Sequence, residues 1–302
     1  MSRASSDLLA CERAIRDGSK SFHFASRLLP RDVRLPACAL YSFCRTADDA
    51  VDEGRGDDRQ TRLVARLDGI YGDGAISSPY DRALREVVRA HRLPRAPFDA
   101  LLEGFAWDAQ GRTYETIEDL EGYCVRVAST VGLLMTLIMG RREADTLARA
   151  CDLGVAMQLT NICRDVGDDA RKGRVYLPLS WLREMGVDPS ELVHAPVHSA
   201  ALGGVVLRVL DEAERLYRLS DMGVGRLPRS CRWSIATASR VYEAIGDEVR
   251  RRGGDGVTSR AVVPAGEQAR LAAVAFGSLV VPTGARSLPA QPAARPLIEA
   301  VR

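Results

Sequence analysis

The chain has 302 residues, of which 46% are hydrophobic and 27% are charged, so it is long and apolar enough to bury one large core. Lys and Arg number 42 against 40 Asp and Glu, and this formal net charge of +2 gives no electrostatic basis for nucleic-acid binding. The seven Cys show no Cys-x-x-Cys spacing and the four His no ligand spacing, which argues against a disulfide framework and a zinc site and favours reduced thiols in a cytosolic protein.

The N-terminal residues are polar and show no signal peptide. The longest apolar runs, residues 131–139 and 271–281, are shorter than a membrane span requires. We therefore expect a protein that is soluble or bound at a membrane surface.

The first two helices are predicted over residues 5–17 and 31–54, with a short polar segment between them. Ser19, Lys20 and Ser21 in this segment combine two hydroxyl groups with an ammonium group, a set that suits a phosphate. N-capping by Ser19 or Ser21 is the simpler explanation of the hydroxyl groups, and the spacing leaves both interpretations open.

A polar stripe follows the helix predicted over residues 31–54. It contains Tyr41, Arg45, Asp48 and Asp52. Their spacing of i, i+4, i+7 and i+11 places them within about 60° of one another on a helix. A single acidic stripe of this kind is usually a solvated face, so its meaning depends on whether it has a partner elsewhere in the chain.

Further helices are predicted over residues 61–71, 81–91 and 94–111, separated by charged or Gly-rich loops. Asp108 near the end of the third is a lone acid, which is typical of a surface or capping residue. The next helix begins after Thr116, which has N-cap character.

The helix that follows Thr116 is apolar and rich in small residues. Tyr123, Val127 and Thr130 share one face of it, which could line an apolar cavity. Gly132 interrupts the helix, and close approach of either a ligand or another helix would explain this glycine.

A second polar stripe lies on the helix predicted over residues 142–167 and its continuation. It contains Gln158, Asn161, Asp165 and Asp169, which fall within about 80° of one another on a helix. Two carboxylates spaced i, i+4 repel each other, so a cation shared by Asp165 and Asp169 is expected. Hard oxygen ligands favour Mg²⁺ for that cation.

The two acidic stripes are far apart in the sequence but share one pattern, with carboxylates aligned along one face of a helix. Facing each other across a cavity, they would hold several Mg²⁺ ions, and such a cluster binds an oligophosphate. Arg45 and Arg164 lie beside the carboxylates and could neutralise the remaining phosphate charge. The basic loop 170–178 could close over bound phosphate, although a basic helix exit explains it as well.

The rest of the chain contains helices predicted over residues 180–186, 199–221, 229–252 and 265–278. Residues 282–302 are rich in Pro, Ala and Arg and are expected to form a mobile tail. No strand alternation or dinucleotide-binding motif is present. The sequence thus predicts one all-α domain over residues 1–281, followed by the tail.

These motifs together resemble the squalene/phytoene synthase family, and within it the bacterial phytoene synthases. The resemblance runs from Ser19 to about Arg260. Its specific pieces are the segment 19–22, the two acidic stripes, the Tyr123-Cys-x-x-Val127-Ala128 sequence and the continuation from Asp169 to Pro178.

The resemblance implies an all-α isoprenoid synthase fold, a helical bundle around a central cavity. It implies the head-to-head (1-1′) condensation of two geranylgeranyl diphosphates, through prephytoene diphosphate, to 15-cis-phytoene in carotenoid biosynthesis. It implies Mg²⁺, with Mn²⁺ as an alternative, and no NADPH. Because the product is extremely hydrophobic, we expect a cytoplasmic enzyme that works at a membrane surface, with other enzymes of the pathway as partners.

The resemblance also assigns site residues by position. The catalytic set is Asp48, Asp52, Asp165, Asp169, Tyr41 and Arg45. The metal ligands are Asp48, Asp52, Asn161, Asp165 and Asp169. The diphosphate contacts are Ser19, Lys20, Ser21, Arg45, Arg164, Tyr242 and Arg260. The prenyl cavity is lined by Phe22, Tyr41, Tyr123, Val127, Ala128, Gly132, Gln158 and Leu159.

Three other functions fit part of this pattern. A squalene or dehydrosqualene synthase would use farnesyl diphosphate, and the length of the cavity distinguishes it. A non-catalytic relative that serves as an assembly or scaffold protein would be expected to have lost its acidic stripes, which are intact here. A terpene cyclase would normally carry a different acidic motif.

Overall fold

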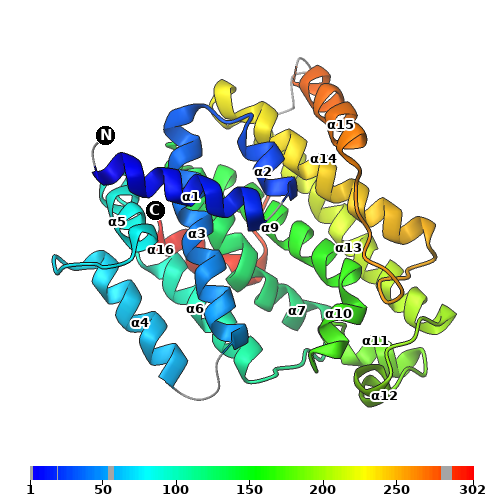
Figure 1. Ribbon diagram of the computed structural model, residues 1–302. Coiled ribbons are helices and arrows are strands. Elements are labelled where there is room, and N and C mark those ends of the chain that lie inside the picture. The colour runs from blue at the N-terminus through cyan, green and yellow to red at the C-terminus, as the bar shows by residue number, and fades with distance from the viewer. Residues whose placement is uncertain (1–2, 19, 54–57, 280–287) are drawn as a thin grey trace.

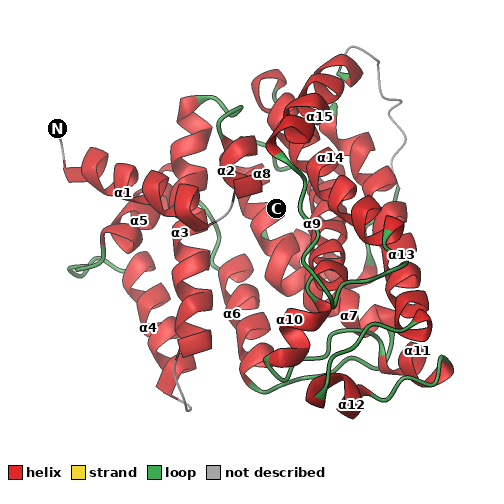
Figure 2. Ribbon diagram, turned by 45° about the vertical axis from the view of Figure 1, so that its right-hand side comes forward, coloured by secondary structure: helices red, strands yellow, loops and turns green. Residues whose placement is uncertain are grey.

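The computed structural model describes residues 3–18, 20–53, 58–279 and 288–302. Within these ranges all regular structure is helical and no strand occurs (Figure 2). The prediction of an all-α fold is therefore confirmed.

The helices follow one another along the chain with short connections (Figure 1). The first are α1 (Arg3–Gly18), α2 (Lys20–Ser26), α3 (Arg31–Glu53), α4 (Asp58–Tyr71), α5 (Pro79–His91), α6 (Ala96–Ala109), α7 (Ile117–Cys124), the π-helical turn η1 (Val125–Ser129) and α8 (Thr130–Ile138). The next are α9 (Ala144–Arg164), α10 (Val166–Arg171), α11 (Leu179–Glu184), α12 (Pro189–His194), α13 (Ala200–Val224), α14 (Arg229–Arg251), α15 (Ala265–Ser278), the 3₁₀ turn η2 (Pro292–Ala294) and α16 (Arg295–Ala300).

The central helix of the bundle is α9 (Figure 1). It packs against α13 and α14, against α7, η1 and α8, and against α16. Helix α3 packs against α1, α5, α6 and α8, and α2 contacts α14. The helices that carry the two acidic stripes, α3 and α9, therefore both belong to the inner part of the bundle.

Local sequence signals set several helix ends. Thr116 and Asp119 form a reciprocal capping box at the start of α7: the Asp119 N–H donates to Thr116 Oγ1, and the Thr116 N–H donates to Asp119 Oδ2. The N-cap predicted at Thr116 is therefore confirmed. Ser78 caps α5 by a single bond, in which its Oγ accepts from the Asp81 N–H, and Pro79 lies in the first turn.

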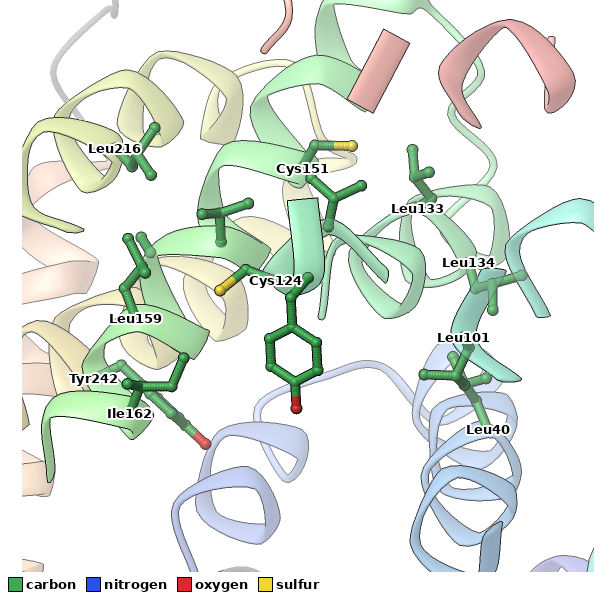
Figure 3. Close-up of a cluster of buried hydrophobic side chains, with 14 of the residues drawn as sticks. Leu40, Leu101, Cys124, Leu133, Leu134, Cys151, Leu159, Ile162, Leu216 and Tyr242 are labelled. Carbon is green, nitrogen blue, oxygen red and sulfur yellow. The ribbon is translucent and has the colours of Figure 1, made fainter. Parts of the chain in front are cut away.

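One continuous core lies between these helices, and Figure 3 shows a part of it. Leu40, Leu101, Leu133 and Leu159 are fully or almost fully buried there. All seven Cys are free, and only Cys44 is not buried. Buried thiols that pack as small apolar groups agree with the predicted reduced state.

One helix, Ile117–Ile138, is long and apolar enough to cross a membrane by length and composition. It consists of α7, η1 and α8, and more than half of its apolar window is buried inside the protein. Its position against α6 and α9 is that of a core helix.

The end of the chain differs from the expected mobile tail. Residues 288–302 fold back onto the bundle, where η2 contacts α7 and η1, and α16 contacts α6 and α9. Ala294, Ile298 and Val301 are each at most 5% exposed. The composition of the tail suggested solvation, but its few apolar residues are spaced to bury one face of a short helix.

Candidate active site

A deep cavity of about 310 Å³ lies inside the bundle and is lined mainly by apolar side chains. Its walls come from α2, α3, η1, α8, α9, α13 and α14. Tyr41 and Cys44 of α3 line it together with Gln158 and Asn161 of α9. The two helices with acidic stripes therefore face one shared cavity.

Most of the residues assigned to the prenyl cavity lie on this wall. They are Tyr41, Val127, Ala128, Gly132 and Gln158. Tyr242, assigned to the diphosphate, also lines the cavity and is 6% exposed, and burial raises its pKa to about 12.

Gly132 lies where α8 meets α9. A Cβ atom at this position would lie 2.7 Å from the carbonyl oxygen of Ala150, which is closer than real side chains allow. Close packing of two helices therefore explains this glycine, which also lines the cavity.

Two of the assigned cavity residues are placed elsewhere. Leu159 is fully buried in the core, because its side chain leaves α9 about 100° away from that of Gln158. Tyr123 does not line the cavity although Val127, four residues later, does. The Tyr123 side chain points to Asp108, to which its hydroxyl donates a hydrogen bond, and not into the cavity.

Tyr123 instead belongs to a cluster of three tyrosines. Its ring lies 5.2 Å from those of Tyr114 and Tyr176. The Tyr123 hydroxyl donates to Asp108 Oδ2 over 2.9 Å, and the Tyr176 hydroxyl donates to Asp108 Oδ1 over 2.7 Å. Asp108 is therefore not the surface or capping residue that its sequence context indicated. Sequence spacing gave no signal for this cluster, because its members come from three separate segments.

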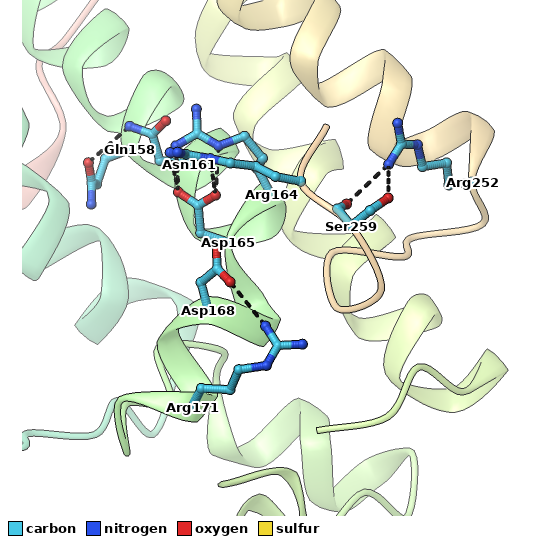
Figure 4. A network of polar contacts seen from close by, with 9 residues as sticks. Gln158, Asn161, Arg164, Asp165, Asp168, Arg171, Arg252 and Ser259 are labelled. Carbon is cyan, nitrogen blue, oxygen red and sulfur yellow. Dashed lines mark hydrogen bonds and ion pairs between the residues drawn. The ribbon is translucent and has the colours of Figure 1, made fainter. Parts of the chain in front are cut away.

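The end of the cavity at Asn161 leads to Asp165 and Asp169, and we call it the acidic or charged end. The Asn161 Nδ2 group donates to Gln158 Oε1 over 3.5 Å, which leaves Asn161 Oδ1 buried and without a hydrogen-bond partner among the described residues (Figure 4). A buried carbonyl oxygen of this kind is costly unless something binds it. Asn161 Oδ1 is thus available to a cation or to a donor on a ligand.

Asp165 and Asp169 follow Asn161 at intervals of four residues. The Asp165 N–H donates to the Asn161 carbonyl and the Asp169 N–H to the Asp165 carbonyl, each over 2.9 Å. Burial, reinforced by the charge of Asp165, raises the pKa of Asp169 to about 7. The arrangement fits a divalent cation, because such an ion would relieve both the repulsion between the carboxylates and their desolvation.

The Asp165 carboxylate also accepts hydrogen bonds from two arginines. Arg164 Nε donates to Oδ1 over 2.8 Å, and Arg260 approaches the same carboxylate with Nε and Nη2 (Figure 4). Arg164 is mostly buried, whereas Arg260 is 57% exposed. These two guanidinium groups, predicted as diphosphate contacts, lie together at the acidic end of the cavity.

The helix that carries the second acidic stripe differs from its predicted form. It was expected to continue over residues 142–167, but α9 ends at Arg164 and α10 begins at Val166. The loop before Arg260 inserts here, since the Gly167 N–H donates to the Gly256 carbonyl over 3.0 Å. The break in the helix is what admits this loop and, with it, Arg260.

The basic loop after α10 lies next to Asp169. The Arg174 N–H donates to the Asp169 carbonyl over 2.9 Å, and the charges of Lys172 and Arg174 oppose the rise in the Asp169 pKa. Asp168 points elsewhere and pairs with Arg171 on an exposed surface (Figure 4). The loop is thus correctly placed to meet an anion at the acidic end.

Several predicted residues lie outside the described part of the chain. Ser19 is outside it entirely. The side chains of Lys20, Ser21 and Phe22 in α2, and of Asp48 and Asp52 in α3, are outside it although the helices themselves are described. Arg45 is exposed on α3. Among the described side chains no group of three or more His, Cys, Asp or Glu could hold a metal ion, so Asp165 and Asp169 require further ligands.

Comparison with known proteins finds close relatives. The family model described as squalene/phytoene synthase matches residues 15–267. A phytoene synthase of Cereibacter sphaeroides is 50% identical over 269 residues, which are 85% of this chain and 76% of that protein. A 15-cis-phytoene synthase of a Paracoccus species is 44% identical over 268 residues, 84% and 86% of the two chains. The crystal structure of a dehydrosqualene synthase in complex with a ligand superposes with a TM-score of 0.83 at 31% identity, covering 92% of this chain and 98% of that one.

Proposed function

The chain belongs to the squalene/phytoene synthase family, and on that premise we propose that it condenses two geranylgeranyl diphosphates head-to-head (1-1′), through prephytoene diphosphate, to 15-cis-phytoene. The observation that carries the proposal is the apolar cavity between α3 and α9, which ends at Asn161 beside Asp165 and two arginines. A hydrocarbon chain fits the cavity, and a diphosphate fits its charged end.

The charged end would bind the diphosphates through Mg²⁺ or Mn²⁺. The residues that would hold these ions are Asp48, Asp52, Asn161, Asp165 and Asp169. When bound, the ions would supply positive charge that stabilises the departing diphosphate. The unpartnered Asn161 Oδ1 and the raised pKa of Asp169 support this ligand set.

Arginine side chains would take the remaining negative charge. Arg164 and Arg260 can turn part of their donor set from Asp165 to diphosphate oxygens, because a guanidinium group has five N–H donors. Arg45 on α3 would act from the opposite helix, and Tyr242 would donate its hydroxyl, whose raised pKa keeps it protonated. Ser19, Lys20 and Ser21 complete the proposed set.

Loss of diphosphate leaves an allylic cation, and the cavity would protect it. Tyr41, Val127 and Ala128 belong to the cavity wall and would exclude water from the cation. The double bond of the second prenyl chain then reaches the cation before water does. Proximity of the two chains within one cavity supplies much of the rate.

The relatives favour phytoene over the products made from farnesyl diphosphate. The two relatives that share 44% and 50% identity with this chain are named phytoene synthases, whereas the dehydrosqualene synthase shares 31%. We infer the longer substrate from this difference, and no reduction by NADPH, because loss of a proton is enough to form phytoene.

Product analysis tests the proposal directly. The purified protein would be incubated with Mg²⁺ and either farnesyl or geranylgeranyl diphosphate, each with and without NADPH. Mass spectrometry is expected to show phytoene from geranylgeranyl diphosphate, with or without NADPH. Squalene or dehydrosqualene as the main product, or no product, would contradict the proposal.

We further propose that the enzyme is cytoplasmic and works at a membrane surface, with other carotenoid-pathway enzymes near it. The support is chemical, because phytoene is insoluble in water and must pass into lipid. Flotation with liposomes of mixed neutral and anionic lipids is expected to carry the protein to the lipid fraction at low salt. Recovery only in the protein fraction, at every salt concentration, would refute the membrane part.

A further inference from the structure

The end of the cavity opposite Asn161 carries a buried charge. Arg149 and Asn161 both lie on α9 and both line the cavity. At 1.5 Å per residue they are separated by roughly 18 Å along the helix. If a prenyl chain starts at the charged end and follows α9, its last isoprene units therefore lie next to Arg149.

Arg149 is only 4% exposed, and its neighbours fix it firmly. Its Nε lies 3.2 Å from Oδ2 of Asp152, which is 1% exposed. Its stem passes Gly223 of α13, where a Cβ atom would collide with the Cβ and Cγ atoms of Arg149. The glycine is thus what allows the long side chain between α9 and α13.

The guanidinium group also joins the cavity wall to the end of the chain. Arg149 Nη2 donates to the carbonyl oxygens of Leu288 and Pro289, over 3.2 and 3.1 Å. These residues begin the segment that continues into η2 and α16, whose buried residues pack against the bundle. The segment itself does not line the cavity, and through these two hydrogen bonds it holds a side chain that does.

This end of the cavity is unfavourable for hydrocarbon. Arg149 Nε and Asp152 Oδ2 face each other at 3.2 Å without forming a hydrogen bond, and Arg149 Nη1 and Asp152 Oδ1 have no hydrogen-bond partner among the described residues. A prenyl methyl group pressed against such groups removes them further from water and gives no hydrogen bond in return. Burial also raises the pKa of Asp152 to about 6, although Arg149 opposes this rise. The rest of the lining has no comparable buried ion pair.

We propose that Arg149 closes the inner end of the cavity, and that Asp152 and the 288–302 segment hold it there, so that Arg149 sets the longest prenyl chain that the enzyme accepts. This inference rests on the proposed function. Arg149 acts on specificity by position and takes no part in the chemistry.

The test compares chain-length preference in Arg149→Met and in the wild type. Methionine keeps an unbranched, flexible stem of similar reach but removes the charge and the bonds to the tail. We expect the ratio of kcat/KM for geranylfarnesyl diphosphate to that for geranylgeranyl diphosphate to rise about tenfold or more, the scale of small changes in an apolar pocket. Loss of stability alone would lower both constants together and leave the ratio unchanged.

Arg142→Met is the matched control. Arg142 donates to the carbonyl oxygens of His91, Arg92 and Val301, so it holds the far end of the same segment, but it does not line the cavity. This variant is expected to unfold at a lower temperature and to keep the wild-type ratio. An equal change of the ratio in both variants would assign the effect to the tail as a whole and overturn the role of Arg149.

A second variant keeps the test decisive if Arg149→Met does not fold. Thr146 lies one turn before Arg149, is 3% exposed and lines the same end. Thr146→Leu adds volume there and should shift preference toward farnesyl diphosphate. If Arg149→Met folds and its ratio of kcat/KM values is unchanged, the inference is overturned. If only Thr146→Leu folds, an unchanged chain-length preference in that variant overturns it. No condensation product from any of the three diphosphates in the wild type would instead refute the proposed function, and this inference with it.

Discussion

Asp165 and Arg260 are separated by 95 residues in the sequence, yet they form a two-pronged ion pair. Arg260 Nε lies 2.9 Å from Oδ1 of Asp165, and Nη2 lies 3.2 Å from Oδ2. Arg164 donates to the same carboxylate. One carboxylate thus holds two guanidinium groups at the charged end of the cavity, where a proposed metal ligand meets the proposed diphosphate contacts.

Asp165→Asn should nearly abolish turnover. The amide keeps the shape of the carboxylate but loses the charge that would bind a divalent cation and that holds both arginines. We expect kcat/KM to fall by at least about 10²-fold, the scale of losing one electrostatic contact in an active site. Asp168→Asn is the control, because Asp168 is an exposed neighbour that pairs with Arg171 on the surface. Near-normal turnover of Asp165→Asn with Mg²⁺ present would refute the assigned role. Asp48→Ala is expected to lose turnover to the same extent as Asp165→Asn.

Arg260→Gln should weaken substrate binding more than it slows the reaction. Arg260 is 57% exposed and approaches Asp165 from outside the cavity, so it is expected to contact diphosphate without touching the reacting carbons. KM for geranylgeranyl diphosphate should rise roughly tenfold, as for loss of one charge-assisted contact. The control is Arg270→Gln, which removes another exposed arginine paired with Glu267 on α15. Equal KM values for the two variants would count against a diphosphate role for Arg260.

The sequence predicted the parts of the site that depend on helical spacing. Tyr41 on α3 and Asn161 on α9 were identified from intervals of three and four residues, and both line the cavity. Such predictions succeed because a stripe on a helix must face one direction. Helical periodicity also predicted the all-α architecture, whereas the resemblance to a known family added Arg260, which no spacing rule connects to Asp165.

Features that depend on a change in helix geometry or on distant contacts were not predictable in this way. Tyr123 and Val127 are one helical turn apart, yet Tyr123 donates to Asp108 and only Val127 of the two lines the cavity. The insertion of Gly256 beside Gly167 ends α9 earlier than its apolar pattern indicates. Asp108 was interpreted as a lone acid, because only the fold brings the tyrosine hydroxyls to it.

Gly256→Ala should destabilise the loop that carries Arg260. A Cβ atom at this position would collide with the Cys163 carbonyl oxygen at the end of α9. Overpacking of this kind typically costs about 1–3 kcal/mol, and urea unfolding measures it. KM should rise as well, because the loop moves Arg260 with it. Gly266→Ala, in open space at the start of α15, should not destabilise the protein and should leave KM unchanged.

Asp108→Asn should lower stability through the tyrosine cluster. Its carboxylate accepts hydrogen bonds from both Tyr123 and Tyr176, whereas an amide offers only one acceptor and leaves one hydroxyl facing a donor. We expect a loss of about 1–3 kcal/mol in the free energy of unfolding. Asp99→Asn, which breaks only an exposed pair with Arg95, should cost less than about 1 kcal/mol. The prediction is wrong if both substitutions cost the same.

Glu121 is expected to make the stability of the protein depend on pH. Burial, together with the neighbouring Glu212, raises the pKa of Glu121 from 4.5 to about 8. The folded protein therefore holds this proton more tightly than the unfolded chain, so the stabilisation is fully present below about pH 4.5 and is lost as the pH rises to about 8. Asp152 and Asp169, whose pKa values are also raised, contribute in the same direction at lower pH.

Glu121→Gln removes this titration while keeping a side chain that can donate to Glu212. Urea unfolding at pH 5, 6, 7 and 8 should show a smaller fall in the free energy of unfolding for the variant than for the wild type. Glu118→Gln, an exposed change one turn earlier on α7, should weaken the dependence only slightly, because the Glu118 charge adds least to the rise in the Glu121 pKa. If Glu121→Gln and the wild type lose stability equally between pH 5 and 8, the Glu121 carboxyl does not hold its proton as its burial requires.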